Sequence, residues 1–122
     1  MILTDIEYHL VLLPCISEIF EEKMKSDLAI IIPDALLEFK GGVKRLQVSP
    51  ERIYIHFSAA PDASPKQIAE TLMRETSTRL VRVNPPLKDF RTVFSEHYFI
   101  KTGARPTKTQ INDFVSLSIS GI

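Results

Sequence analysis

The residues with the clearest chemical potential lie in one short alternating stretch. Residues 52–57 read Arg-Ile-Tyr-Ile-His-Phe, so Arg52, Tyr54 and His56 fall at every second position, with apolar residues between them. A period of two predicts a central strand that buries one face and presents the other to a partner. Two histidines spaced in this way could together hold a divalent metal. The first two positions here carry a permanent cation, which repels a metal, and a phenol that is mostly protonated at neutral pH.

Other side chains could supply metal-binding or nucleophilic chemistry. His56 and His97 are the weak metal candidates, because a set of Tyr54, His56 and His97 could bind a metal if their strands were neighbours. No carboxylate accompanies that set, and a half-buried histidine hydrogen-bonded within the sheet is the simpler interpretation of His56. Tyr98 has the hydroxyl that a nucleophile needs, but its apolar neighbours in the sequence favour a packing role.

Composition predicts one ordinary globular domain over residues 1–122. Fifteen basic and fifteen acidic residues give a net charge of zero, so overall charge does not indicate a nucleic-acid partner. Residues 1–49 carry five basic and eight acidic side chains, whereas residues 50–122 carry ten and seven, a mild asymmetry that a solvated surface also explains. The single cysteine, and the lack of a signal peptide or a membrane-length apolar run, predict a cytoplasmic protein without membrane contact.

The surrounding elements that must position these residues follow from hydrophobic spacing and from turn residues. The predicted order is a strand over 2–14, a helix from 17, a helical segment over 34–40, strands over 43–48 and 52–57, a helix over 65–83, a strand over 97–102 and a helix from about 107. Pro33 is expected to interrupt the first helix. Residues 29–32 fit either a strand or a buried helix. Ser64 followed by Pro65 predicts a capped helix start.

This order predicts an α+β fold. It is the ferredoxin-like or RRM-like split β-α-β-β-α-β arrangement, an antiparallel sheet with helices on one face, plus an extra C-terminal helix. Such a fold serves many unrelated functions, so function has to be argued from the site.

Four stretches in succession resemble one known family. They are Tyr8–Val11, Ser49–Tyr54, Ile68–Leu80 and Val93–Ile100, which are spread over most of the chain in the family's order. The second stands where the family has a Pro-Asp-His-hydrophobe-His sequence. In this respect the chain resembles transposases of the insertion-sequence-200/605 type, which are single-tyrosine members of the HUH nuclease superfamily.

The resemblance implies a metal-dependent DNA-nicking site and also shows where this chain departs from it. Family members nick single-stranded DNA at the foot of a hairpin, using a tyrosine nucleophile and a Mg²⁺ or Mn²⁺ ion held by two histidines and a glutamine. In this sequence the histidine positions carry Arg52 and Tyr54, the nucleophile position carries Phe114, and the glutamine position carries Ser118. Phe114 has no hydroxyl to attack phosphorus. The resemblance therefore implies an inactive transposase-like homologue, without catalytic residues and without the family's metal.

The same resemblance implies a homodimer and a DNA partner, either single-stranded or hairpin DNA. Arg52 could contact the phosphate directly in place of the metal, and Phe114 could be an apolar anchor in a dimer interface where C-terminal helices are exchanged. The candidate DNA-binding residues are Arg52, Arg74, Arg79, Arg82, Lys101 and Arg105. Two alternatives remain open, a dimeric structural or regulatory domain without DNA binding, and an active DNA-nicking transposase with relocated catalytic residues.

Overall fold

Strands and helices follow one another in the predicted order. The computed structural model describes residues 6–15, 24–85, 87 and 93–119. The elements are β1 (Ile6–Pro14), α1 (Met24–Leu36), the short 3₁₀ helix η1 (Leu37–Phe39), β2 (Gly42–Ser49), β3 (Arg52–Ala59), α2 (Pro65–Val83), β4 (Phe94–Thr102) and α3 (Lys108–Ile119). The α+β class and the split β-α-β-β-α-β order with an added C-terminal helix are confirmed.

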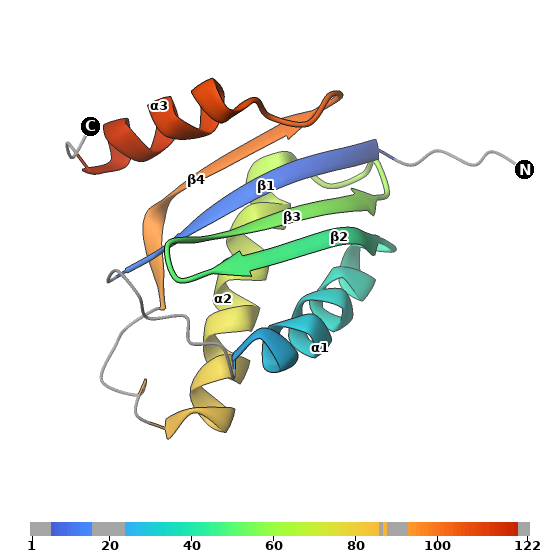
Figure 1. Ribbon diagram of the computed structural model, residues 1–122. Helices are drawn as coiled ribbons and strands as arrows, with labels where there is room; N and C mark the ends of the chain where they lie inside the picture. Colours follow the sequence, from blue (N-terminus) through green and yellow to red (C-terminus); the bar gives the residue numbers. More distant parts are fainter. Residues whose placement is uncertain (1–5, 16–23, 86, 88–92, 120–122) are drawn as a thin grey trace, which may run out of the picture.

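The four strands form one antiparallel sheet in the order β2-β3-β1-β4 (Figure 1). β3 is therefore an interior strand, as the alternating stretch predicts. Its Ile55 lies opposite Leu10 of β1 and Leu46 of β2, so the three strands place apolar residues on the same side of the sheet. Paired residues of neighbouring strands share a face of the sheet, so this register determines which side chains lie together at the site.

One side of the sheet, here called the core face, packs against α1 and α2 (Figure 1). The apolar residues of the alternating strands point to it, and Leu10, Ile55 and Phe57 have no exposed surface. Phe57 stacks on Tyr8 across the β1–β3 pair, with the ring centres 5.4 Å apart. Burial of these side chains supplies the main stabilisation of the fold, at about 1.5–3 kcal/mol for each large side chain.

Pro33 does not interrupt the first helix, and the prediction that it would is wrong. α1 continues through Pro33 to Leu36, so residues 29–32 are helical. A proline removes the hydrogen bond to the carbonyl four residues earlier, which here belongs to Ala29. Ala29 is exposed, so water can reach that turn, while Leu28, Ile32 and Leu36 on the opposite side of the helix are fully buried. Their burial offsets the cost of the proline.

Helix starts follow the sequence signals closely. The Ser64 hydroxyl accepts a hydrogen bond from the Gln67 backbone N–H at 3.1 Å, with Pro65 at the first helical position, as predicted. At α3, the Gln110 N–H donates to the Thr107 hydroxyl at 3.1 Å and the Thr107 N–H donates to the Gln110 side chain at 2.9 Å. This reciprocal pair is a capping box, which fixes where the chain turns from β4 into α3.

The turn between η1 and β2 depends on one glycine. Lys40 takes the left-handed conformation at φ 55°, and the Gly41 backbone N–H donates to the Leu36 carbonyl. A side chain at Gly41 would lie 2.0 Å from the Ser58 carbonyl oxygen on β3, so only glycine allows this close approach.

The start of β4 differs from its predicted position, and two predicted segments cannot be compared with the structure. β4 begins at Phe94, earlier than the predicted start at His97. The predicted strand residues 2–5 and the predicted helix residues 17–23 lie outside the described residues. None of the helices described is long and apolar enough to cross a membrane.

Candidate nucleic-acid interface

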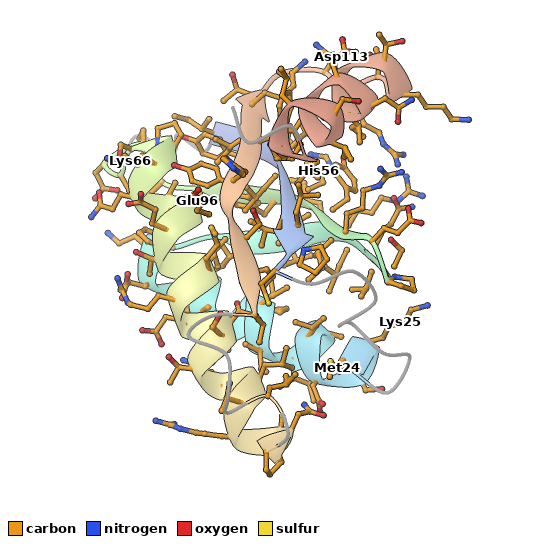
Figure 2. The ribbon with its side chains drawn as sticks, turned by 90° about the vertical axis from the view of Figure 1, so that its left-hand side faces the viewer. Met24, Lys25, His56, Lys66, Glu96 and Asp113 are labelled. Atoms are coloured by element: carbon orange, nitrogen blue, oxygen red, sulfur yellow. The ribbon has the colours of Figure 1, made fainter. Side chains whose placement is uncertain are left out.

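The face of the sheet opposite the core, here called the second face, carries the polar members of the alternating strands. Arg52, Tyr54 and His56 of β3 point to it, as the sequence predicts. Their register partners on β2 are Ser49, Gln47 and Arg45, and β1 contributes His9 opposite His56. In Figure 2, His56 lies toward α3 and away from Met24 at the start of α1.

Tyr54, which the resemblance assigns to one of the two histidine positions, has its hydroxyl held in a buried hydrogen bond. The hydroxyl oxygen lies 2.7 Å from His9 Nδ1, and His9 Nε2 lies 2.8 Å from the Gly103 carbonyl oxygen. Tyr54 is 6% exposed and His9 is 3% exposed. The chain Tyr54–His9–Gly103 therefore links β3, β1 and the connection from β4 to α3.

The direction of these bonds follows from the acceptor at one end. A carbonyl can only accept, so His9 Nε2 carries the hydrogen that it donates to Gly103. In the neutral imidazole Nδ1 then accepts, and the Tyr54 hydroxyl donates to it. Burial raises the pKa of Tyr54 above its usual value, and the Arg105 and Arg45 guanidinium groups only partly oppose that rise. Tyr54 therefore keeps its proton at neutral pH and is a donor rather than a metal ligand.

His56 belongs to a separate, more exposed group on the same face. Its Nε2 lies 3.2 Å from Glu7 Oε1, and the Lys44 ammonium lies 3.5 Å from the same oxygen. The His56 ring stacks on His9 with the ring centres 4.3 Å apart. His56 is thus a sheet histidine with hydrogen-bond and stacking partners, as its simpler interpretation predicts.

α3 packs on the second face through an apolar cluster. Val11, Leu13 and Tyr54 form the buried part, and the partly buried side chains against it are Phe99 of β4 and Ile111, Phe114 and Val115 of α3. The Phe114 ring lies 5.8 Å from the Phe99 ring. The structure thus brings together, in one cluster of a single chain, Tyr54 and Phe114, which the resemblance assigns to a metal position and to the nucleophile position. The Ser118 hydroxyl donates to the Phe114 carbonyl, a local bond within α3.

Beside this cluster lie three arginines. The Arg105 guanidinium sits over the Tyr54 ring, 4.8 Å from its centre, and donates to the Gln47 side-chain oxygen at 3.0 Å. Arg45 is close enough to influence the Tyr54 hydroxyl, and Arg52 lies two residues before Tyr54 on the same face. In the part of the chain that the structure describes, neither Arg45 nor Arg52 has an acidic partner. We call Arg45, Arg52 and Arg105 the arginine group.

The predicted DNA-binding residues divide between two sides of the molecule. Arg52, Arg105 and Lys101, which lies opposite His9, belong to the second face and its edge. Arg74, Arg79 and Arg82 lie on α2, which packs against the core face. Arg79 is committed to an ion pair with Asp34 and lies 3.9 Å from Glu75. The six residues are therefore not one contiguous surface.

The residues at the family's metal positions do not fit a divalent ion. Arg52 is a cation, and the Tyr54 oxygen is occupied by its bond to His9. His56 and His97 lie on β3 and β4, which are separated by β1, and His97 contacts Glu96 at 3.7 Å. Within residues 6–15, 24–85, 87 and 93–119, no three His, Cys, Asp or Glu side chains are placed to hold a metal.

Sequence reasoning missed Arg45, Gln47 and the role of His9. The first two could have been found from the alternation of Arg45, Gln47 and Ser49 with Leu46 and Val48. An irregularity between Val43 and Arg45 shifts the pairing, however, and no sequence signal marks it. The contacts of His9 join residues 45 and 94 positions apart, beyond the reach of local patterns.

Residues 2–116 match the family described as "Transposase IS200 like". This chain belongs to that family. Among curated proteins, none matches the chain. The family match spans the second face, the core and α3 as far as residue 116, so it includes Tyr54 and Phe114, whereas Ser118 lies two residues beyond it.

Two solved structures share the fold. A candidate transposase from Deinococcus radiodurans R1 is 18% identical, with a TM-score of 0.81 over 94% of this chain and 92% of that chain. A REP-associated tyrosine transposase bound to a REP hairpin is 10% identical, with a TM-score of 0.51 over 95% of this chain and 68% of that chain. At these identities the likeness concerns the fold of the IS200-like domain.

Proposed function

We propose that this IS200-like transposase homologue binds single-stranded or hairpin DNA on its second face and does not cleave it. The observation that carries the proposal is that residues unable to cleave DNA lie beside the arginine group. Tyr54 and Phe114 fill the metal and nucleophile positions with a hydrogen-bonded phenol and an apolar ring. Arg45 and Arg52 flank them without acidic partners among the described residues.

Cleavage would need groups that these positions do not offer. A phosphotyrosine intermediate needs a hydroxyl that can lose its proton beside the phosphate, and Phe114 has none. A metal would have to neutralise charge on the phosphoryl oxygens. Arg52 repels such an ion, and the Tyr54 hydroxyl keeps its proton, so we propose that the family's Mg²⁺ or Mn²⁺ is not used.

Binding, in contrast, needs only donors that match phosphate. A guanidinium forms charge-assisted bonds to two phosphate oxygens at once, without a metal. Arg52 therefore takes over the contact to the phosphate, with Arg45 and Arg105 as neighbours that hold the adjoining backbone. The solved relative bound to a REP hairpin supports a hairpin as the form of DNA to test first.

The proposal includes a homodimer. Among the described strands, β2 and β4 are the two edges of the sheet, and an edge strand offers backbone groups that a second copy could meet. α3 already packs on its own sheet through Phe114, so this dimer does not require an exchanged helix. Sedimentation velocity over a range of concentrations measures the oligomeric state.

Gel-shift titration with a hairpin and an unstructured oligonucleotide, at two salt concentrations, tests DNA binding. We expect binding that weakens as salt rises, because bound phosphates release counterions. Arg52→Ala should weaken it several-fold, whereas Arg74→Ala, which removes an exposed arginine from α2, should leave it unchanged. No shift with either oligonucleotide at low salt would contradict the proposal.

The same titration distinguishes the second candidate, a dimeric structural or regulatory domain without DNA binding. The zero net charge and the division of the predicted arginines between two sides favour this candidate. It predicts a stable dimer that shifts neither oligonucleotide. A DNA adduct that survives denaturation would instead indicate a nuclease with relocated residues.

A further inference from the structure

A groove between α1 and α2 lies on the side of the molecule away from the second face. It has a volume of about 560 Å³ and is lined by Ile30, Ile31, Pro33, Asp34, Leu37, Arg79, Arg82 and Val83. Ile30, Leu37 and Val83 expose 73%, 66% and 56% of their surfaces. Among the described residues, the other large hydrophobic side chain exposed to this degree is Leu117 of α3. Three such side chains gathered in one groove mark an interaction surface.

The shape of the groove suits a helix. α1 and α2 run in opposite directions, because Asn84 at the end of α2 bonds Asp27 in the first turn of α1, and Arg79 pairs with Asp34 farther along. Ile30 on α1 and Leu37 at the start of η1 are seven residues apart, which is about two helical turns or about 10 Å along the helix axis. A third helix could lay its apolar residues along this length, in the groove-binding mode that amphipathic helices use.

The charges around the groove indicate which charge a binding partner should carry. Arg79 is neutralised by Asp34 and by the nearby Glu75. Arg82 is exposed and has no ion-pair partner in the described part of the chain. Of the three charged residues in the lining, Arg79 and Asp34 pair with each other, so Arg82 is the positive charge left without a partner among the described residues. A partner with a carboxylate at this rim is therefore favoured over one with a cation.

We propose that the α1–α2 groove docks an acidic amphipathic helix of another protein. The helix places its apolar residues between Ile30, Leu37 and Val83 and a carboxylate beside Arg82. This surface also gives a role to an arginine that does not reach the second face. The proposal is independent of DNA binding, because the groove and the arginine group lie on opposite sides of the sheet.

The test uses two synthetic helical peptides of about 15 residues, a length at which a helix becomes marginally stable in water. Both have leucines along one face, and they differ only in flanking glutamates or lysines. Titrated into the isotope-labelled full chain, the glutamate peptide should shift the amide resonances of Ile30, Leu37 and Val83 to saturation. The lysine peptide should bind about tenfold more weakly.

Charge reversal makes the test specific. Arg82→Glu, at an exposed position in the last turn of α2, should weaken the glutamate peptide about tenfold and strengthen the lysine peptide. Leu37→Ser should weaken both peptides, because it removes an apolar contact. Leu117→Ser is the matched control on α3 and should change neither.

Three results would overturn the proposal. The first is that neither peptide shifts the groove resonances, and the second is that both bind alike and Arg82→Glu changes neither. The third is that the chain alone sediments as a dimer that Leu37→Ser dissociates, since a second copy of this protein would then be the occupant.

Discussion

The two faces of the sheet are built from the same strands, yet they hold their side chains in different ways. On the core face, Leu10, Ile55 and Phe57 are fully buried by α1 and α2. On the second face, Tyr54 and His9 are fixed by directed hydrogen bonds, and Arg52 is left without an acidic partner among the described residues. The core face is explained by folding alone. The second face keeps polar groups that packing does not require, so it is the face on which we propose a function.

Truncating one side chain from each face of β3 should give the largest difference between the two faces. Phe57→Ala should lower the free energy of unfolding by about 3–5 kcal/mol, because it removes a fully buried ring and leaves a cavity. Arg52→Ala should change it by no more than about 0.5 kcal/mol. Urea denaturation of both variants measures the contrast. Equal losses would mean that the second face is as much a folding surface as the core face.

A smaller effect should come from the buried hydroxyl on the second face. Tyr54→Phe keeps the ring but leaves His9 Nδ1 without its partner, which should cost about 1–2 kcal/mol. Tyr98→Phe is the control, since Tyr98 is partly buried on β4 outside this network, and should cost less than about 0.5 kcal/mol. If the two variants lose the same stability, the Tyr54–His9–Gly103 chain does not contribute as described.

The pH dependence of the free energy of unfolding tests the raised pKa of Tyr54. The pKa of Tyr54 is raised in the folded state, chiefly by burial, so the folded protein holds that proton to higher pH than the unfolded chain. The resulting stabilisation is complete below about pH 10, the ordinary tyrosine pKa, and is lost as pH rises through the folded value. Denaturation at pH 8 to 11 should therefore show a steeper loss in the wild type than in Tyr54→Phe, by at most about 1.4 kcal/mol for each unit by which the pKa is raised. Parallel curves would contradict the raised pKa.

Much of the fold was accessible from sequence because its signals are local. The alternation over residues 52–57 predicted an interior strand, and Ser64-Pro65 predicted the start of α2, as found. Pro33 misled the prediction because burial of the opposite side of α1 outweighs one lost hydrogen bond. The packing of α3 on the second face through Phe114 depends on tertiary contacts that no local pattern encodes.

The site was predictable only in part, and for a related reason. The family motif located Arg52, Tyr54, Phe114 and Ser118, and the structure places Tyr54 and Phe114 in one cluster. Helical spacing could not show that Arg79 pairs with Asp34 on α1. Nor could it show that the connection after β4 would bring Arg105 over Tyr54, since that contact joins residues that are far apart in the sequence.

A single incubation of the protein with labelled hairpin DNA and Mn²⁺, divided between a native and a denaturing gel, shows whether the protein binds this DNA without cleaving it. We predict a shifted complex on the native gel and no label on the protein after denaturation, for the wild type and for Phe114→Tyr alike. The variant regains a hydroxyl, but Arg52 and Tyr54 still occupy the metal positions. A denaturation-resistant adduct with the wild type, or no native complex at low salt, would contradict the account.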